Sequence, residues 1–257
     1  MEREPINALI LAGSRQGKQD PLALHAHVSH KAIIPVLGKP MIEYVTETLA
    51  KIESINKIAV SIEKFEVVRN ILPNFIKYLP TCPGPSASII QAIQALGTPL
   101  LITTADNPLL QPEWVEYFIQ EAEASQCDLA VGIALKEQIE KDVPNTKRTY
   151  IKLADGSFSG CNIFMFRTPR SIQVAKLWQK LESYRKSPVK MGLLLGYSII
   201  LRYILHRLTR KALKKRIFKL TNVKIHFVII PWGQAAVDVD KPDDLHLVNN
   251  LMSDRSN

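Results

Sequence analysis

The sequence predicts an α/β protein in which a mostly parallel sheet is covered by helices on both faces. Two observations lead to this fold class. Short apolar runs alternate with segments of helical periodicity along most of the chain, an order that is typical of parallel sheets. The chain has 257 residues of which 46% are hydrophobic, which is enough to bury one large core.

The alternation is clearest in the first half of the chain. Buried strands are expected at 6–12, 57–62, 75–79, 99–105 and 127–135. Helices are expected at 40–52, 86–96 and 111–125. The first and third of these segments carry a proline near the start, and Gly97 follows the second, as helix termini favour.

The second half is less regular but continues the pattern. The pattern at 148–167 predicts two strands joined by a turn at Asp155-Gly156. A helix at 169–185, a strand at 223–230 and a closing helix at 241–252 follow. There is no internal repeat and no low-complexity linker, so residues 1–257 are expected to form a single domain.

Composition limits the class of protein. The three cysteines are far apart and form no CxxC pair, which argues against a disulfide framework or a structural zinc site and suits a reducing cytoplasm. The N-terminus, MEREPINALILAG, has no basic region before a long apolar stretch, so no signal peptide is expected.

Positive charge is concentrated in one segment. Residues 183–237 hold twelve of the 33 Lys and Arg residues and no Asp or Glu, leaving 21 basic residues against 24 acidic ones elsewhere. Within it, a basic amphipathic helix is expected at about 186–220, and the apolar stripe that defines it over 190–219 comprises Leu194, Tyr197, Leu201, Ile204, Leu205, Leu208 and Ala212. Either the stripe packs on the core, or the helix lies on an anionic membrane surface.

A glycine-containing loop follows the first strand, with the sequence LAGSRQGK at 11–18. Such a loop can present backbone N–H groups to phosphates. It matches neither the P-loop nor the dinucleotide-binding pattern. Taken alone, it is equally compatible with an ordinary turn that carries solvated Arg15 and Lys18.

Acidic residues stand at two further points of interest. Asp106 in TTADNPLL ends a buried strand, where a carboxylate is costly unless it is paired. Asp240 in AAVDVDKPDDL precedes the last helix, and Asp238 lies on the same side of an extended segment. Asp106 and Asp240 could each cap a turn or hold a metal ion.

These stretches together resemble the nucleoside-triphosphate transferase family, which includes molybdenum cofactor guanylyltransferases and sugar-phosphate nucleotidyltransferases. The resemblance rests on the loop at 11–18, on KAIIPVLGKPMI at 31–42, on TTADNPLL and on the motif at 235–245. The loop departs from the family pattern, because Ser14 and Gln16 replace glycines and Lys18 replaces an arginine.

The resemblance implies a three-layer, Rossmann-like fold of the glycosyltransferase-A type with about seven strands in a mixed sheet. It implies a Mg²⁺-dependent transfer of a nucleoside monophosphate from a triphosphate, with CTP or GTP favoured, to a phosphorylated acceptor, with release of pyrophosphate. The implied catalytic residues are Lys18, Lys31 and Asp106, and the implied metal ligands are Asp106 and Asp240. The implied nucleotide-binding residues are Leu11, Ala12, Gly13, Ser14, Arg15, Gly17, Lys18, Lys31, Ser86 and Ser88, and the acceptor-binding residues are Gly160, Asn162 and Asp238.

Several alternatives stay open at this point. Ser86 and Ser88 could cap the helix at 86–96 or touch the nucleotide, and capping is favoured. DVD at 238–240 also matches the metal motif of nucleotide-sugar glycosyltransferases of the same fold. A non-catalytic adaptor at a membrane surface is a third hypothesis. No nucleic-acid partner is expected, a cytoplasmic or peripheral membrane location is expected, and the base, the acceptor and the oligomeric state are left undetermined.

Overall fold

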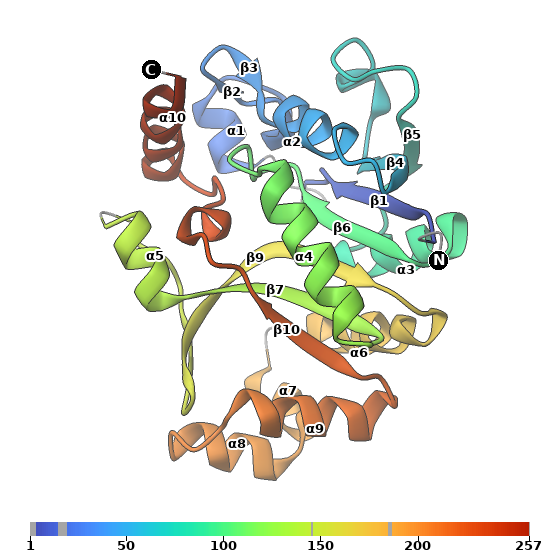
Figure 1. Ribbon diagram of the computed structural model, residues 1–257, viewed down its shortest axis with the longest axis vertical. Helices are drawn as coiled ribbons and strands as arrows, with labels where there is room; N and C mark the ends of the chain where they lie inside the picture. Colours follow the sequence, from blue (N-terminus) through green and yellow to red (C-terminus); the bar gives the residue numbers. More distant parts are fainter. Residues whose placement is uncertain (1–3, 15–19, 145, 185–186, 257) are drawn as a thin grey trace.

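The computed structural model describes residues 4–14, 20–144, 146–184 and 187–256. Within these residues, one eight-stranded sheet is covered by helices on both faces, as expected (Figure 1). Its strands are β1 (Ile6–Leu11), β4 (Ile55–Ile62), β5 (Lys77–Pro80), β6 (Leu100–Thr104), β7 (Leu129–Leu135), β8 (Ile151–Leu153), β9 (Gly156–Phe166) and β10 (Ile225–Ile229). A separate two-stranded ribbon pairs β2 (Pro35–Val36) with β3 (Lys39–Pro40).

The strands follow the order β10-β7-β9-β6-β1-β4-β5, and β8 pairs with β9 outside this path. β9 runs antiparallel to β6, β7 and β8, whereas β10, β7, β6, β1, β4 and β5 share one direction. The carboxyl ends of six strands therefore meet at one edge of the sheet. The strand order also reverses beside β1, and ligands of open α/β sheets bind at such a point.

The helices outside the basic segment are α1 (Pro21–His25), α2 (Met41–Ala50), α3 (Pro85–Leu96), α4 (Pro112–Ala124), α5 (Lys136–Asp142), α6 (Ile172–Ser183) and α10 (Pro242–Ser256). Successive side chains of a strand point to opposite faces, and the two cores follow from this. On β1, Ile10 packs with α2 and α4, while Leu9 packs with α3 and α6 on the other face. Leu101 and Ile102 divide in the same way on β6.

The basic segment differs from the single helix that its sequence predicts. Three short helices, α7 (Pro188–Leu195), α8 (Tyr197–Ile204) and α9 (Arg210–Thr221), replace it. Gly196 separates α7 from α8 with a φ of +94°, and His206 adopts the left-handed conformation after α8. The hydroxyl of Thr209 then accepts the backbone N–H of Ala212 and caps the start of α9. The helical spacing of apolar residues continues through Gly196 and His206, so the sequence pattern does not reveal that the helix is broken there.

A short 3₁₀ helix, η4 (Gly233–Ala236), joins β10 to the segment that carries Asp238 and Asp240. Gly233 anchors this connection, since its N–H donates to a carboxylate oxygen of Asp142 at 2.7 Å. A Cβ atom at position 233 would lie only 2.5 Å from the carbonyl oxygen of Gln138 and 2.6 Å from Cα of Ile139. Only glycine permits this close approach to α5.

We therefore expect Gly233→Ala to lower the free energy of unfolding by about 1–3 kcal/mol, because backbone atoms must move to admit the methyl group. Urea unfolding followed by circular dichroism would measure the change. Gly160→Ala is the matched control, because a Cβ there meets no atom within 4 Å. Equal losses in the two variants would contradict the packing argument.

Candidate active site

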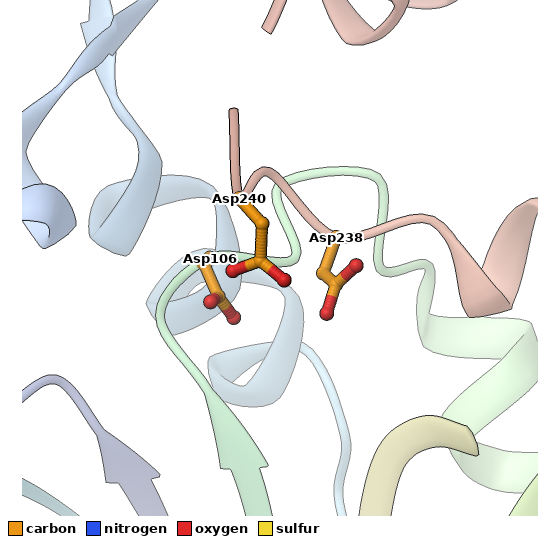
Figure 2. Close-up of side chains that lie close together, drawn as sticks. All are labelled: Asp106, Asp238 and Asp240. Atoms are coloured by element: carbon orange, nitrogen blue, oxygen red, sulfur yellow. The ribbon is translucent and has the colours of Figure 1, made fainter. Parts of the chain in front are cut away.

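Three aspartates converge at the carboxyl edge of the sheet (Figure 2). Asp106 lies in the turn after β6, and Asp238 and Asp240 lie in the segment before α10. One oxygen of each carboxylate lies within 4.8 Å of the others. The backbone N–H of Val239 donates to the carbonyl oxygen of Asp106 at 2.9 Å and holds the two segments together.

Lys31 neutralises two of these acids. Its Nζ atom lies 2.6 Å from a carboxylate oxygen of Asp106 and 2.5 Å from one of Asp240. Burial alone would lower the pKa of Lys31, but the two carboxylates outweigh burial and raise this pKa above its ordinary value. Lys31 therefore keeps its charge and joins the two aspartates that the family resemblance assigns to the metal.

Arg148 forms an ion pair with the third acid. Its guanidinium, only 7% exposed, pairs with the carboxylate of Asp238 and donates to the carbonyl oxygen of the same residue at 2.7 Å. It also donates to Asp244 at 3.2 Å, and Asp244 in turn accepts the N–H groups of Asp240 and Lys241. Asp244 thus fixes the path of the acidic segment in addition to standing in the first turn of α10.

Asn162 reaches the cluster because β9 is irregular. The β7–β9 register shifts between Val131 and Ile133, and Asn162 adopts the left-handed conformation in the resulting bulge. Bulges often redirect a side chain next to a functional site. Here the amide of Asn162 donates to Asp238 at 2.9 Å. Burial, followed by the charges of Asp106 and Asp240, raises the pKa of Asp238 against the opposing effects of Arg148 and Asn162.

The loop after β1 lies at the same edge of the sheet. Gly13 lies close to β5 there, since a Cβ atom would lie 2.7 Å from the side-chain Cγ2 atom of Thr81, which would have to move. The N–H of Ser14 donates to the carboxylate of Glu63, so it points to an anionic oxygen. The N–H of Ala12 instead bonds to the carbonyl oxygen of Ser61 and the carbonyl of Leu11 accepts the N–H of Ala105, so these groups serve the sheet. Arg15, Gly17 and Lys18, which are also expected to bind the nucleotide, lie outside the described residues.

The two serines near the start of α3 do not cap it, contrary to the expectation. Gly84 holds the capping position, with no side-chain hydrogen bond to the helix. Ser86 is fully buried and its hydroxyl donates to Glu182, while the hydroxyl of Ser88 accepts the N–H of Cys82. Gly160 lies exposed on β9, on the strand that carries Asn162.

Sequence reasoning missed two residues of the site, Arg148 and Glu63. Arg148 stands in the irregular stretch after α5, and its two acidic partners are 90 and 96 residues away. Glu63 follows β4 directly, as Asp106 follows β6. A search for charged residues at the carboxyl end of every predicted strand would have found Glu63 but not Arg148.

The cluster fits a hard divalent cation. All the converging donors are carboxylate oxygens, which Mg²⁺ prefers. The Oδ1 atom of Asp106 is buried and has no hydrogen-bond partner among the described residues. The 4.8 Å limit is close to the ~4.2 Å that separates opposite ligands of Mg²⁺. Small side-chain rotations would bring the oxygens into range.

The fold and the site together define a class. A mixed α/β sheet with a glycine loop after β1, a lysine and clustered aspartates at its carboxyl edge is the arrangement of nucleoside-triphosphate transferases of the glycosyltransferase-A type. Residues 8–219 match the family model of the MobA-like NTP transferase domain, and the chain belongs to that family. The match ends before Asp238 and Asp240, so their place in the site rests on the structure.

Individual relatives agree with this assignment. A molybdenum cofactor guanylyltransferase from Cupriavidus necator is 27% identical over 141 residues, which cover 52% of this chain and 65% of that protein. A hypothetical transferase from Thermus thermophilus aligns with a TM-score of 0.81 and 27% identity over 94% of this chain and all of its own. A CMP:2-keto-3-deoxy-manno-octonic acid synthetase complexed with CTP shares the fold, with a TM-score of 0.60, 15% identity and coverage of 98% and 100%.

The buried position of Arg148 gives a prediction about stability. We expect Arg148→Ala to lower the free energy of unfolding by about 3–5 kcal/mol, because the buried Asp244 and the partly buried Asp238 would lose their counter-charge. Denaturant titration would measure this loss. Arg210→Ala, which removes a more exposed pair with Asp155, is the control and should cost at most about 1 kcal/mol. A loss below that of the control would refute the role given to Arg148.

Proposed function

We propose that this protein is a Mg²⁺-dependent nucleotidyltransferase. It transfers a nucleoside monophosphate from a nucleoside triphosphate to a phosphorylated small molecule and releases pyrophosphate. The observation that carries the proposal is the contact of one lysine, Lys31, with two aspartates that end different segments at the carboxyl edge of the sheet. CTP and GTP are favoured, since one relative is named a guanylyltransferase and a synthetase of the same fold was solved with CTP.

The protein's part in this reaction is to position the two substrates and to neutralise the charge on their phosphates. An oxygen of the acceptor phosphate attacks the α-phosphorus, the bond from that phosphorus to the bridging β-oxygen breaks, and pyrophosphate leaves with the bonding electrons. Attacking and leaving groups are both anionic, so stabilisation of charge by fixed groups lowers the barrier. No covalent intermediate with the protein is needed.

Asp106 and Asp240 would hold the Mg²⁺ ion, and Asp238 supports them from beside Asp240. When bound, Mg²⁺ would orient the phosphate oxygens and neutralise part of their charge. Gly13 keeps the loop backbone close to the strand ends, and the neighbouring N–H of Ser14 points to an anionic partner. Lys18 is assigned to the triphosphate by its place in the loop.

Lys31 can pair either with the aspartates or with the phosphates of a bound nucleotide. Its ammonium group now balances Asp106 and Asp240, which would otherwise repel each other. We infer that the group turns to the phosphates when the nucleotide and its cation enter. Lys31 thus offsets part of the charge of the aspartate cluster before the nucleotide binds, and part of the triphosphate charge afterwards.

The acceptor would bind on the side of β9. Gly160 leaves open space there, and Asn162 and Asp238 form a polar wall. Asp238 is an acid whose partners Arg148 and Asn162 come from the protein, so it suits hydroxyl groups of an acceptor better than its phosphate.

The first test is a thermal-shift screen of CTP, GTP, ATP and UTP with Mg²⁺. A triphosphate at a hundred times its Kd should stabilise the protein by about 2.7 kcal/mol and raise Tm by roughly 5–10 °C. We expect Asp106→Asn to abolish this shift and to lower turnover at least about 100-fold, because the metal anchor is lost. Asp243→Asn, an exposed acid of the same charge, should leave both unchanged.

Product analysis separates the two enzymatic hypotheses. Pyrophosphate formed from a bare triphosphate supports the nucleotidyltransferase. Release of a nucleoside diphosphate from a nucleotide sugar, without pyrophosphate formation, would favour the glycosyltransferase instead. If Asp106→Asn and the parent protein respond alike to every triphosphate, the proposed metal site is wrong.

The dual role of Lys31 predicts opposite changes in two measurements. Lys31→Met should raise the affinity for Mg²⁺ in the absence of nucleotide, because the competing ammonium group is gone. The same variant should lose turnover by about 10²–10³-fold, as removal of a charge-stabilising group does. Isothermal titration with Mg²⁺ alone and steady-state kinetics would measure the two effects. A variant with unchanged Mg²⁺ affinity would show that Lys31 does not compete for the acids.

A further inference from the structure

The helical insertion, formed by α7, α8 and α9, exposes an apolar stripe to solvent. Tyr197, Leu201, Ile204 and Leu205 are 75%, 58%, 64% and 52% exposed. They are spaced as i, i+4, i+7 and i+8, so the three residues of α8 share one face and Leu205 continues it directly after the helix. Large apolar side chains gathered in this way mark an interaction site.

The exposure does not come from poor packing of the insertion. Ile199 on α8 and Leu208 in the turn before α9 are 7% and 5% exposed. The N–H of Ala154 donates to the carbonyl oxygen of Leu208, and the guanidinium of Arg210 pairs with Asp155. One face of the insertion is therefore fixed to the protein at the β8–β9 turn, while the apolar stripe faces away. This excludes the core-packed alternative for α8.

Unpaired positive charge lies on the same helices as the stripe and next to them. Arg202 and Arg207 lie on and just after α8, and Lys211 and Lys215 lie on α9; all four are exposed. None of the four forms an ion pair with any residue that the structure describes. No acidic residue occurs between 183 and 237 to offset them.

We propose that this face of the insertion docks the protein on an anionic membrane surface. Apolar side chains enter the boundary between headgroups and acyl chains, and the exposed cations of the insertion meet anionic headgroups. Tyr197 and Tyr203 are both more than half exposed, and tyrosine favours this interface because its ring is apolar and its hydroxyl is polar. No helix among the described residues has the length and apolar content to cross a bilayer, so the contact is a surface one.

Charge and apolar surface together favour a membrane over a second copy of this chain or a nucleic acid. A second copy would bring an equally basic face against the first, and the like charges would repel. A nucleic acid would satisfy the cations but leave four large apolar side chains without a matching surface. Of these three occupants, only an anionic membrane supplies complementary charge and an apolar layer together.

Vesicle sedimentation of the full chain tests the proposal. We expect at least about tenfold tighter binding to phosphatidylcholine vesicles containing phosphatidylglycerol than to phosphatidylcholine alone, and weaker binding as salt rises. The double variant Leu201→Glu and Ile204→Glu should lose about tenfold or more in affinity, because two charges would enter the apolar boundary. Phe75→Glu is the matched control, because Phe75 is 63% exposed at a site far along the chain from the insertion.

A second variant guards against a folding defect. Arg202→Gln with Arg207→Gln keeps the apolar stripe and should weaken binding to the anionic vesicles only. Equal binding of the parent to both vesicle types, or to neither, would overturn the proposal. So would a dimer in sedimentation velocity that the Leu201 and Ile204 variant abolishes, since the occupant would then be a second copy. None of these outcomes bears on the triphosphate screen, so the two proposals stand or fall separately.

Discussion

Mutual repulsion among Asp106, Asp238 and Asp240 is the constraint on which the site depends. Three carboxylates this close are stable only if cations neutralise them, because like charges at such distances destabilise one another where water is partly excluded. The protein supplies two cations of different kinds. Arg148 is buried and pairs with both Asp238 and Asp244, so its contacts with these acids are permanent. Lys31 reaches Asp240, whose side chain is largely exposed, so its contact can be exchanged for other partners.

The fold brings these charges together through a few local devices rather than through one motif. β6 and β10 run in the same direction, so the turn after β6 and the segment after β10 end at one edge. The hydrogen bond from Val239 to Asp106 then joins the two segments. The bulge in β9 turns Asn162 toward Asp238, and Gly233 lets η4 approach α5 closely enough to set the path of the acids. Loss of any one device would move a carboxylate without removing it.

The sequence predicts those parts of the molecule whose physics is local. The apolar runs and helical stripes locate the strands and main helices to within a few residues. Asp106 and Asp240 draw attention because one follows a buried strand and the other precedes the last helix, whereas Lys31 is assigned through the family resemblance alone. Arg148 is missed because its role exists only through contacts with residues that are distant in the chain. The breaks at Gly196 and His206 are missed because they depend on backbone conformation, which apolar periodicity does not report. Ser86 is misjudged because Glu182, its partner, arrives from α6.

The position of the insertion bears on which acceptors could reach the active site while the protein is docked on a membrane. The insertion is fixed to the β8–β9 turn through Asp155, and the bulge at Asn162 lies six residues after Gly156, where β9 begins. An extended strand rises by about 3.3 Å per residue, so the acid cluster stands roughly 20 Å along β9 from this anchor. With β9 directed away from the membrane, a phosphate within a bilayer headgroup would not extend that far. Membrane docking would therefore hold the enzyme beside a membrane step that supplies its substrate or uses its product, while the acceptor itself reaches the site from water.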